Sequence, residues 1–283
     1  MTDLTHPLFL FGPGYSARRL ARIWSGSVYG TVRRPDKMPA LQADGIRPVL
    51  LGDDEPDLAA CLTGAHLVIS APPGPDGCPA LACLQRHIRL PRSVTYLSTT
   101  GVYGDRQGGW VFEWSQTTPQ TPRSERRVAA EQGWQQSRPD TCVVRLPGIY
   151  GPGRSAIDRV REGTARRIVK PGQVFSRIHV SDLASGLVAL IEARAQGVFH
   201  LCDEGPAPPQ DVTRFAADLL GVDPGQEIPF DAAGLSEMAR GFYSECKRVA
   251  NARIKSATGW RPAYPTYREG LRAILNESAP ATA

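Results

Sequence analysis

A glycine-rich turn close to the beginning of the chain constrains its fold more than any other feature. The apolar run 8–11 leads into Gly12-Pro13-Gly14-Tyr15-Ser16-Ala17, a G-x-G-x-x-A pattern, and the amphipathic stretch 16–24 overlaps its end. The first glycine of such a pattern makes a tight turn, the second lets backbone approach a pyrophosphate, and the final small residue keeps the helix close to the strand. This strand, turn and helix context favours dinucleotide binding over an accidental glycine turn.

Short apolar runs alternate with amphipathic stretches through the first half of the chain, which is typical of βα units that feed a parallel sheet. The fold class predicted is therefore α/β, a Rossmann-type doubly wound, mostly parallel sheet. We expect strands over 8–11, 28–32, 48–51, 67–71, 94–98 and 141–146, with helices over 16–24, 57–62, 81–88, 126–137, 183–193 and 212–220.

Past residue 148, Pro and Gly become frequent and the predicted elements become shorter, which indicates a smaller mixed C-terminal lobe. We expect a dinucleotide-binding domain over 1–150 with a return around 176–205. The smaller substrate lobe would comprise 151–175 and 206–275. The small polar residues 276–283 are expected to form a disordered tail.

Charge and cysteine content exclude several classes of function. The 33 basic and 28 acidic residues give a net charge of +5, spread without the Lys/Arg cluster of a nucleic-acid-binding arm, so an anionic small molecule is the expected partner. The six cysteines show no C-x-x-C spacing, which argues against a metal site. No apolar run approaches the ~18 residues of a membrane span, and Asp3 stands where a secretory signal would carry a base, so we expect a cytoplasmic protein.

The end of the second predicted strand distinguishes the two nicotinamide dinucleotides. An acid there bonds the ribose 2′-hydroxyl, whereas an arginine accommodates a 2′-phosphate. The chain has Arg33 and Arg34 and no acid, so NADP(H) is favoured over NAD(H); the alternative is that both are solvated surface charges. Asp53 follows the third strand and either faces the adenine or serves as a loop acid or helix cap.

Four further segments occur in an order that is similar to one known family. They are Tyr96 to Asp105, ending in V-Y-G-D; Val144 to Arg154, reading R-x-x-x-I-Y-G-P-G-R; Arg177 to Leu183; and Gly197 to Asp203. With the glycine loop they resemble the extended short-chain dehydrogenase/reductase superfamily, in its NAD-dependent epimerase/dehydratase branch. The resemblance covers nearly the whole chain.

The resemblance implies a catalytic set that this chain keeps only in part. The family uses a Ser or Thr at the end of strand five, matched by Thr99, and a Tyr-x-x-x-Lys on the next helix, where Arg123 and Arg127 stand. Arg127 is expected to bond the cofactor ribose, but a guanidinium stays protonated, so Arg123 is no general acid or base. This departure resembles the atypical YeeZ-like subgroup. Tyr103 and Tyr150 are substitute proton donors or, more simply, packing residues.

A literal Tyr-x-x-x-Lys at Tyr243 to Lys247 lies far from strand five and is expected to be coincidental. The resemblance places substrate phosphates near Arg154, Arg177 and His179, for each of which ligand contact and a structural role are weighed equally. Asp182 is expected to cap the helix that follows it, and Trp260 and Tyr264 to lie in the core of the smaller lobe. The cofactor is expected to contact Gly12, Gly14, Tyr15, Ala17, Arg33, Arg34, Asp53, Ala71, Pro72, Thr99, Arg127 and Pro147.

Two functions follow as hypotheses. The first is an NAD(P)-dependent oxidoreductase or epimerase-like enzyme that acts on an anionic small molecule, either nucleotide-linked or not. The alternative, motivated by Arg123, is a non-catalytic NAD(P)-binding regulatory or sensor protein. The family resemblance also makes a homodimer a possible assembly, through helices that flank the sheet.

Overall fold

The computed structural model describes residues 3–52 and 56–277, and a seven-stranded parallel sheet organises them. The strand order is β11-β7-β5-β4-β1-β2-β3. Strands β2 and β3 are added on one side of β1 and the later strands on the other, so the order in which the chain adds its parallel strands reverses between β1 and β4. The strands are β1 (Leu8–Phe11), β2 (Val28–Val32), β3 (Arg47–Leu50), β4 (His66–Ile69), β5 (Ser93–Thr99), β7 (Cys142–Leu146) and β11 (Gly197–His200). The α/β class and the doubly wound sheet are confirmed.

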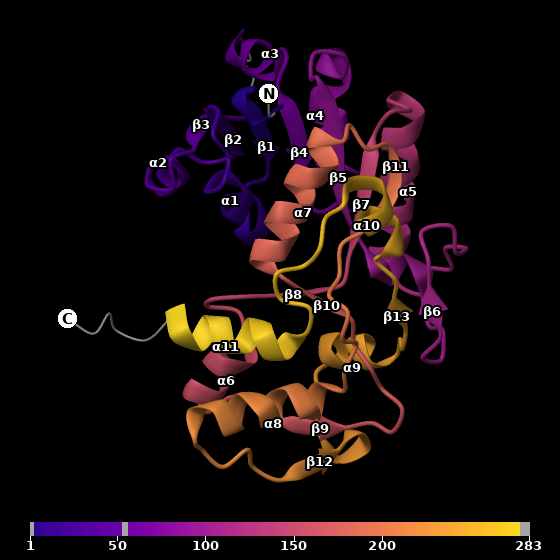
Figure 1. The fold of residues 1–283 in the computed structure, drawn as a ribbon. Helices are drawn as coiled ribbons and strands as arrows, with labels where there is room; N and C mark the ends of the chain where they lie inside the picture. The colour runs from indigo at the N-terminus through magenta and orange to yellow at the C-terminus, as the bar shows by residue number, and fades with distance from the viewer. Residues whose placement is uncertain (1–2, 53–55, 278–283) are drawn as a thin grey trace, which may run out of the picture.

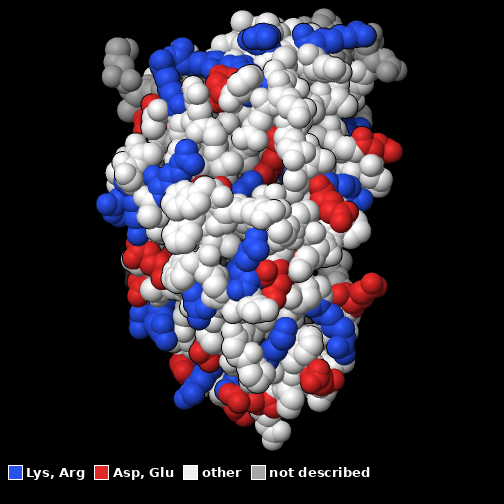
Figure 2. All heavy atoms as spheres, turned by 90° about the vertical axis from the view of Figure 1, so that its right-hand side faces the viewer, with Lys and Arg blue, Asp and Glu red and all other residues white. Residues whose placement is uncertain are grey.

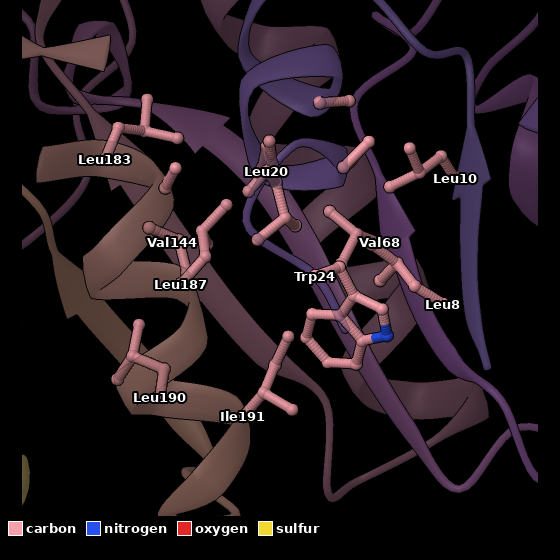
Figure 3. Close-up of a cluster of buried hydrophobic side chains, with 14 of the residues drawn as sticks. Leu8, Leu10, Leu20, Trp24, Val68, Val144, Leu183, Leu187, Leu190 and Ile191 are labelled. Carbon is pink, nitrogen blue, oxygen red and sulfur yellow. The ribbon is translucent and has the colours of Figure 1, made fainter. Parts of the chain in front are cut away.

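Helices cover both faces of the sheet, and strand β1 shows why. Leu8 and Leu10 belong to one buried cluster and Phe9 and Phe11 to the other, as the two-residue period of a strand requires. Figure 3 shows the first cluster, where α1 and α7 pack on β1, β4 and β7. The helices of this layered part are α1 (Tyr15–Ala21), α2 (Met38–Gln42), α3 (Pro56–Leu62), α4 (Pro79–Leu84), α5 (Pro122–Ser137) and α7 (Val180–Glu192).

A smaller lobe lies below the carboxyl ends of the large sheet in Figure 1. Three two-stranded parallel pairs, β8 with β10, β9 with β12 and β6 with β13, form its extended structure and its connection to the sheet. The strands are β6 (Trp110–Val111), β8 (Gly148–Tyr150), β9 (Arg167–Val169), β10 (Arg177–His179), β12 (Glu227–Pro229) and β13 (Arg248–Val249). The remaining helices are α6 (Ala156–Arg161), α8 (Pro209–Leu220), α9 (Glu237–Tyr243), α10 (Ala252–Thr258) and α11 (Tyr267–Glu277).

Several boundaries differ from the sequence expectations for physical reasons. Helix α5 begins at Pro122 rather than at residue 126, because the Thr121 hydroxyl accepts from the Ser124 amide and caps it. Helix α11 continues to Glu277, so the first two residues of the expected tail are helical, and the rest of that tail lies outside the described residues. The smaller lobe gains strands that are too short to give a periodic signal.

Two assignments near α7 were wrong. The cap of α7 is His179, whose ring nitrogen accepts from the Ser181 amide, and not Asp182. The Asp182 carboxylate instead accepts from the amides of Ala263 (2.8 Å) and Tyr264 (3.0 Å). That anchor holds the C-terminal segment across α7, so Trp260 packs in the core of the large sheet rather than in the smaller lobe.

Candidate functional site

The glycine loop lies where the order of the parallel strands reverses, the place where open α/β sheets bind ligands. Gly12 has a φ of +76°, which favours glycine, and its amide donates to Thr31 Oγ1 at 2.9 Å. The Gly14 amide donates back to the Gly12 carbonyl at 2.8 Å. The turn that the sequence predicted is therefore formed and held from β2.

The two glycines differ in what surrounds them. A Cβ added to Gly12 would lie 2.8 Å from the Cβ of Ala71, whereas one added to Gly14 would have its nearest neighbour at 4.0 Å. Gly14 precedes α1, which has no side-chain cap, and Ala17 is fully buried against the sheet. Open space beside Gly14 and uncapped amides in the first turn of α1 fit the pyrophosphate of a dinucleotide.

The end of β2 presents two arginines in different states. Arg34 is exposed and its guanidinium is committed to Asp36, with Nε to Oδ1 at 2.9 Å and a second nitrogen to Oδ2 at 2.5 Å. This hydrogen bonding lowers the pKa of Asp36. Arg33 is exposed and forms no bond with any other described residue, so it is the better placed for a 2′-phosphate. Asp53 lies outside the described residues.

Thr99 ends β5, half-buried, and its Oγ1 accepts from the Gly101 amide at 3.2 Å, which leaves its own proton to be donated. Thr99 is paired in register with Leu146, so Pro147 lies at the adjacent strand end. Ala71, half-buried, and Pro72, exposed, follow β4 at the same edge of the sheet. The expected cofactor residues of β4, β5 and β7 therefore share one edge.

The two arginines that replace the Tyr and Lys have different places. Arg123 is exposed in the first turn of α5, whereas Arg127, one turn later, is buried. Arg127 donates through one terminal nitrogen to the Tyr96 hydroxyl at 3.1 Å and to the Leu97 carbonyl at 2.8 Å. Burial raises the pKa of Tyr96 to about 12 in spite of Arg127. Arg127 thus holds α5 on β5 with that nitrogen.

Tyr103 is fully buried inside a polar network that sequence reasoning did not find. Its hydroxyl lies 2.6 Å from His200 Nε2 and accepts from Arg145 at 2.7 Å. His200 Nδ1 faces the Ala250 carbonyl at 2.9 Å, and the Tyr103 hydroxyl also donates to the Phe112 carbonyl at 3.0 Å, so its single proton serves that carbonyl as well as Nε2. Burial raises the pKa of Tyr103 to about 12 and lowers that of His200 to about 4. Tyr103 is a packing residue here rather than a proton donor in a cleft.

A cavity of about 330 Å³ lies between β8, β10, α6 and α11. Three arginines, Arg154, Arg159 and Arg177, line it with two acids, Asp158 and Glu162, and with Tyr150, Tyr267 and Leu271; the Asp158 carboxylate is bonded to Ser155. Arg177 donates to the carbonyls of Phe175 (2.7 Å) and Ala207 (3.0 Å), and its burial lowers the pKa of its guanidinium. Two of the three predicted substrate residues, Arg154 and Arg177, therefore meet at one cavity, and Arg159 joins them without having been predicted.

His179 lies behind the wall of that cavity and does not line it. It is fully buried between the rings of Tyr150 and Tyr264, with centroids 5.2 and 4.3 Å away. Burial lowers the pKa of His179 to about 4, so it caps α7 as a neutral ring. Of the two roles weighed for His179, the structure shows the structural one.

The two side chains of the literal Tyr-x-x-x-Lys, Tyr243 and Lys247, contact residues that do not belong to β5. The Tyr243 ring packs edge-on against Phe175, 5.5 Å between centroids, and Lys247 pairs with Glu245 at 2.5 Å.

Among the described residues, no three or more His, Cys, Asp or Glu side chains gather to hold a metal ion. No helix in residues 3–52 and 56–277 has the length and apolarity needed to cross a membrane.

Comparison with solved structures and curated proteins identifies relatives. A functionally unknown conserved protein from Silicibacter pomeroyi DSS is 47% identical, with a TM-score of 0.90 over 96% of this chain and 99% of that one. A 3-diazoavenalumate denitrifying reductase from Streptomyces sp is 31% identical over 46% of this chain and 45% of its own length. The dTDP-4-dehydrorhamnose reductase of Mycobacterium tuberculosis is 29% identical over 66% of this chain and 64% of its own length.

The alignments with these two curated reductases cover about half to two thirds of their length. Solved epimerases and dehydratases match 95–97% of the chain with TM-scores of 0.69–0.75 at 14–24% identity, which shows the shared fold. No model of a protein family matches the chain.

Proposed function

We propose that this chain, which is one family with the functionally unknown Silicibacter pomeroyi protein, is a member of the extended short-chain dehydrogenase/reductase superfamily in its NAD-dependent epimerase/dehydratase branch, binds NADP(H) and reduces or epimerises an anionic small molecule. The observation that carries this proposal is the open, uncapped space beside Gly14 at the reversal point of the sheet. Two curated relatives are named reductases, which supports reduction of the substrate by the cofactor.

In this proposal, different residues of the chain bind the cofactor and polarise the substrate. Gly12, Gly14 and the first turn of α1 bind the pyrophosphate, and Arg33 binds the 2′-phosphate that distinguishes NADP(H). When bound, the dinucleotide supplies or accepts a hydride. Thr99 donates its hydroxyl proton as a hydrogen bond to a substrate carbonyl oxygen and so stabilises negative charge that develops there.

The substrate's anionic group would occupy the cavity of Arg154, Arg159 and Arg177. Arginine forks suit phosphate or carboxylate groups, which they bind through two parallel hydrogen bonds. A nucleotide-linked or phosphorylated carbonyl compound satisfies both the cavity and Thr99. Because Arg123 is exposed and stays protonated, the proton that the family's tyrosine would donate comes from solvent in this proposal, and this departure supports an atypical member of the superfamily.

The exposed Arg123 also favours a second candidate, a nucleotide-responsive protein without turnover. Oxidation of NADPH across a panel of aldehydes, ketones and 4-keto sugars separates the two. Turnover that is lost in Thr99→Ala, with NADPH still bound, supports the enzyme. Binding of NADPH without turnover of any substrate in the panel supports the sensor.

A further inference from the structure

The side chain of Tyr15 joins the glycine loop to the loop that carries Arg154. Its hydroxyl donates to the Pro152 carbonyl at 3.1 Å, and the Arg154 guanidinium carbon lies 5.7 Å from the centre of its ring. Tyr15 directly follows Gly14 and is the first residue of α1, so its own backbone belongs to the proposed pyrophosphate site. One residue therefore touches both proposed binding regions.

The loop 151–154 is built tightly around this contact. Gly151 and Arg154 bond to each other's backbone, with N to O distances of 3.3 and 2.9 Å. A Cβ on Gly151 would collide with the Tyr15 hydroxyl and with Val180 of α7. Since the loop closes on Tyr15 with no space to spare, a displacement of Tyr15 moves Pro152 and with it the Arg154 that lines the cavity.

The hydroxyl of Tyr15 is suited to a lasting contact. Burial raises the pKa of Tyr15, with Arg154 opposing and Asp158 adding to that shift, so the hydroxyl keeps the proton that it donates to Pro152. The face of α1 behind Tyr15 is fixed by Arg19, which donates to the Ser181 hydroxyl of α7 at 2.8 Å. The contact of Tyr15 with Pro152 thus ties loop 151–154 to a helix that is itself held to α7.

We infer that Tyr15 is a positioning residue that couples the two sites, so that a dinucleotide bound at the glycine loop sets Arg154 for an anion in the cavity. The inference rests on the proposed function and adds its regulation: the two ligands bind with positive cooperativity. Linkage requires the effect to be mutual, because each ligand must change the affinity of the other by the same factor.

The test is the dissociation constant of NADPH, measured with and without inorganic phosphate at constant ionic strength, and the reverse titration of phosphate with and without NADPH. We expect each ligand to tighten the other about 5-fold or more. In Tyr15→Phe, which keeps the ring and loses the hydroxyl, this factor falls towards one. Arg154→Ala removes it as well, and Tyr29→Phe, a tyrosine on β2 whose hydroxyl only meets Arg47 at 3.4 Å, keeps it.

Each other outcome overturns the inference in a recognisable way. Phosphate that weakens NADPH equally in the wild type and in Tyr15→Phe competes at the glycine loop and does not couple. If both ligands bind but neither changes the affinity of the other, the coupling through Tyr15 is wrong and the proposed cofactor site is unaffected. The same holds if the effect persists in Tyr15→Phe. A protein that binds no nucleotide loses the cofactor proposal, and the coupling with it.

Discussion

Arg145 on β7 and Glu131 on α5 form a doubly bonded ion pair in the interior, with Nε 3.1 Å and a terminal nitrogen 2.7 Å from the Glu131 carboxylate oxygens. Their side chains are 7% and 4% exposed. Ser98 of β5 donates to the same carboxylate. Thus β5, which ends at Thr99, α5, which carries Arg127, and β7, which Pro147 directly follows, are fixed to one another through a single buried carboxylate.

Glu131→Ala is expected to destabilise the protein by about 3–5 kcal/mol, because it leaves the Arg145 charge buried without its partner. Urea unfolding measures this. The matched control is Asp218→Asn, which removes a pair between exposed side chains 4.0 Å apart and should cost less than about 1 kcal/mol. Equal losses in the free energy of unfolding for the two substitutions would show that the buried pair stabilises the protein no more than the exposed pair does.

Gly12→Ala is expected to cost about 2–4 kcal/mol, since the new Cβ meets both a positive φ and the Cβ of Ala71 at 2.8 Å. Gly64→Ala is the control: its φ of +70° is similar, but nothing lies within 4 Å of the added atom. That variant should lose only about 1 kcal/mol, for backbone strain alone. Thermal unfolding of both variants measures whether the contact with Ala71 adds to the cost of backbone strain at Gly12; equal losses in the two variants would show that it does not.

Arg33→Ala is expected to weaken NADPH about 10-fold or more while NADH binding stays unchanged, because only NADPH carries the 2′-phosphate. Arg34→Ala should have the smaller effect, since the Arg34 guanidinium is already committed to Asp36. Titrations of both variants with both nucleotides measure this. Parallel losses for NADH and NADPH in Arg33→Ala would remove the assigned preference.

Asp203 should make stability depend on pH. Its carboxylate is 1% exposed, and burial raises its pKa from 3.8 to about 7, although Arg177 opposes and Asp182 adds to that shift. The folded protein therefore holds a proton that the unfolded chain releases. This contribution to stability is full below pH 4 and is lost as pH rises towards 7, by at most about 1.4 kcal/mol per pH unit.

Asp203→Asn, neutral at every pH, should remove that contribution. Relative to the wild type, the variant gains stability between pH 4 and 7 and is the more stable protein at pH 8. Urea unfolding at several pH values measures the difference between the two. A difference that stays constant over this range would show that folding does not raise the pKa of Asp203.

The sheet could be predicted because its signal is local. Residues 8–11 and 28–32 place apolar side chains on both faces of a buried strand, and the glycine turn after the first of these strands depends on the conformational freedom of Gly12 itself. Strands β3, β4, β5 and β7 were predicted to within two residues, whereas the edge strand β11 was not predicted as a strand. Elements of two or three residues, such as β6 and β13, are held by their partner strands and left no periodic pattern.

The candidate site was predicted only where one residue defines a role by its own chemistry. Gly12 falls into that class, whereas Thr99 was matched through the family resemblance and its role stays a prediction. The state of Arg34 depends on Asp36, that of His179 on the helix it caps, and that of Asp182 on amides 81 and 82 residues away. The Glu131–Arg145 pair joins a helix to a strand, which no spacing in the sequence announces.

The affinities of the wild type and of Gly14→Ala for NADPH and NADH, followed through the five tryptophans, test most directly whether the space beside Gly14 receives a dinucleotide. Gly14 has an extended backbone and room for a Cβ, so the variant should unfold within about 0.5 kcal/mol of the wild type. We predict tight NADPH binding by the wild type and a loss of about 10-fold or more in Gly14→Ala. Binding of neither nucleotide by the wild type, or equal NADPH affinity in both proteins, would contradict the account.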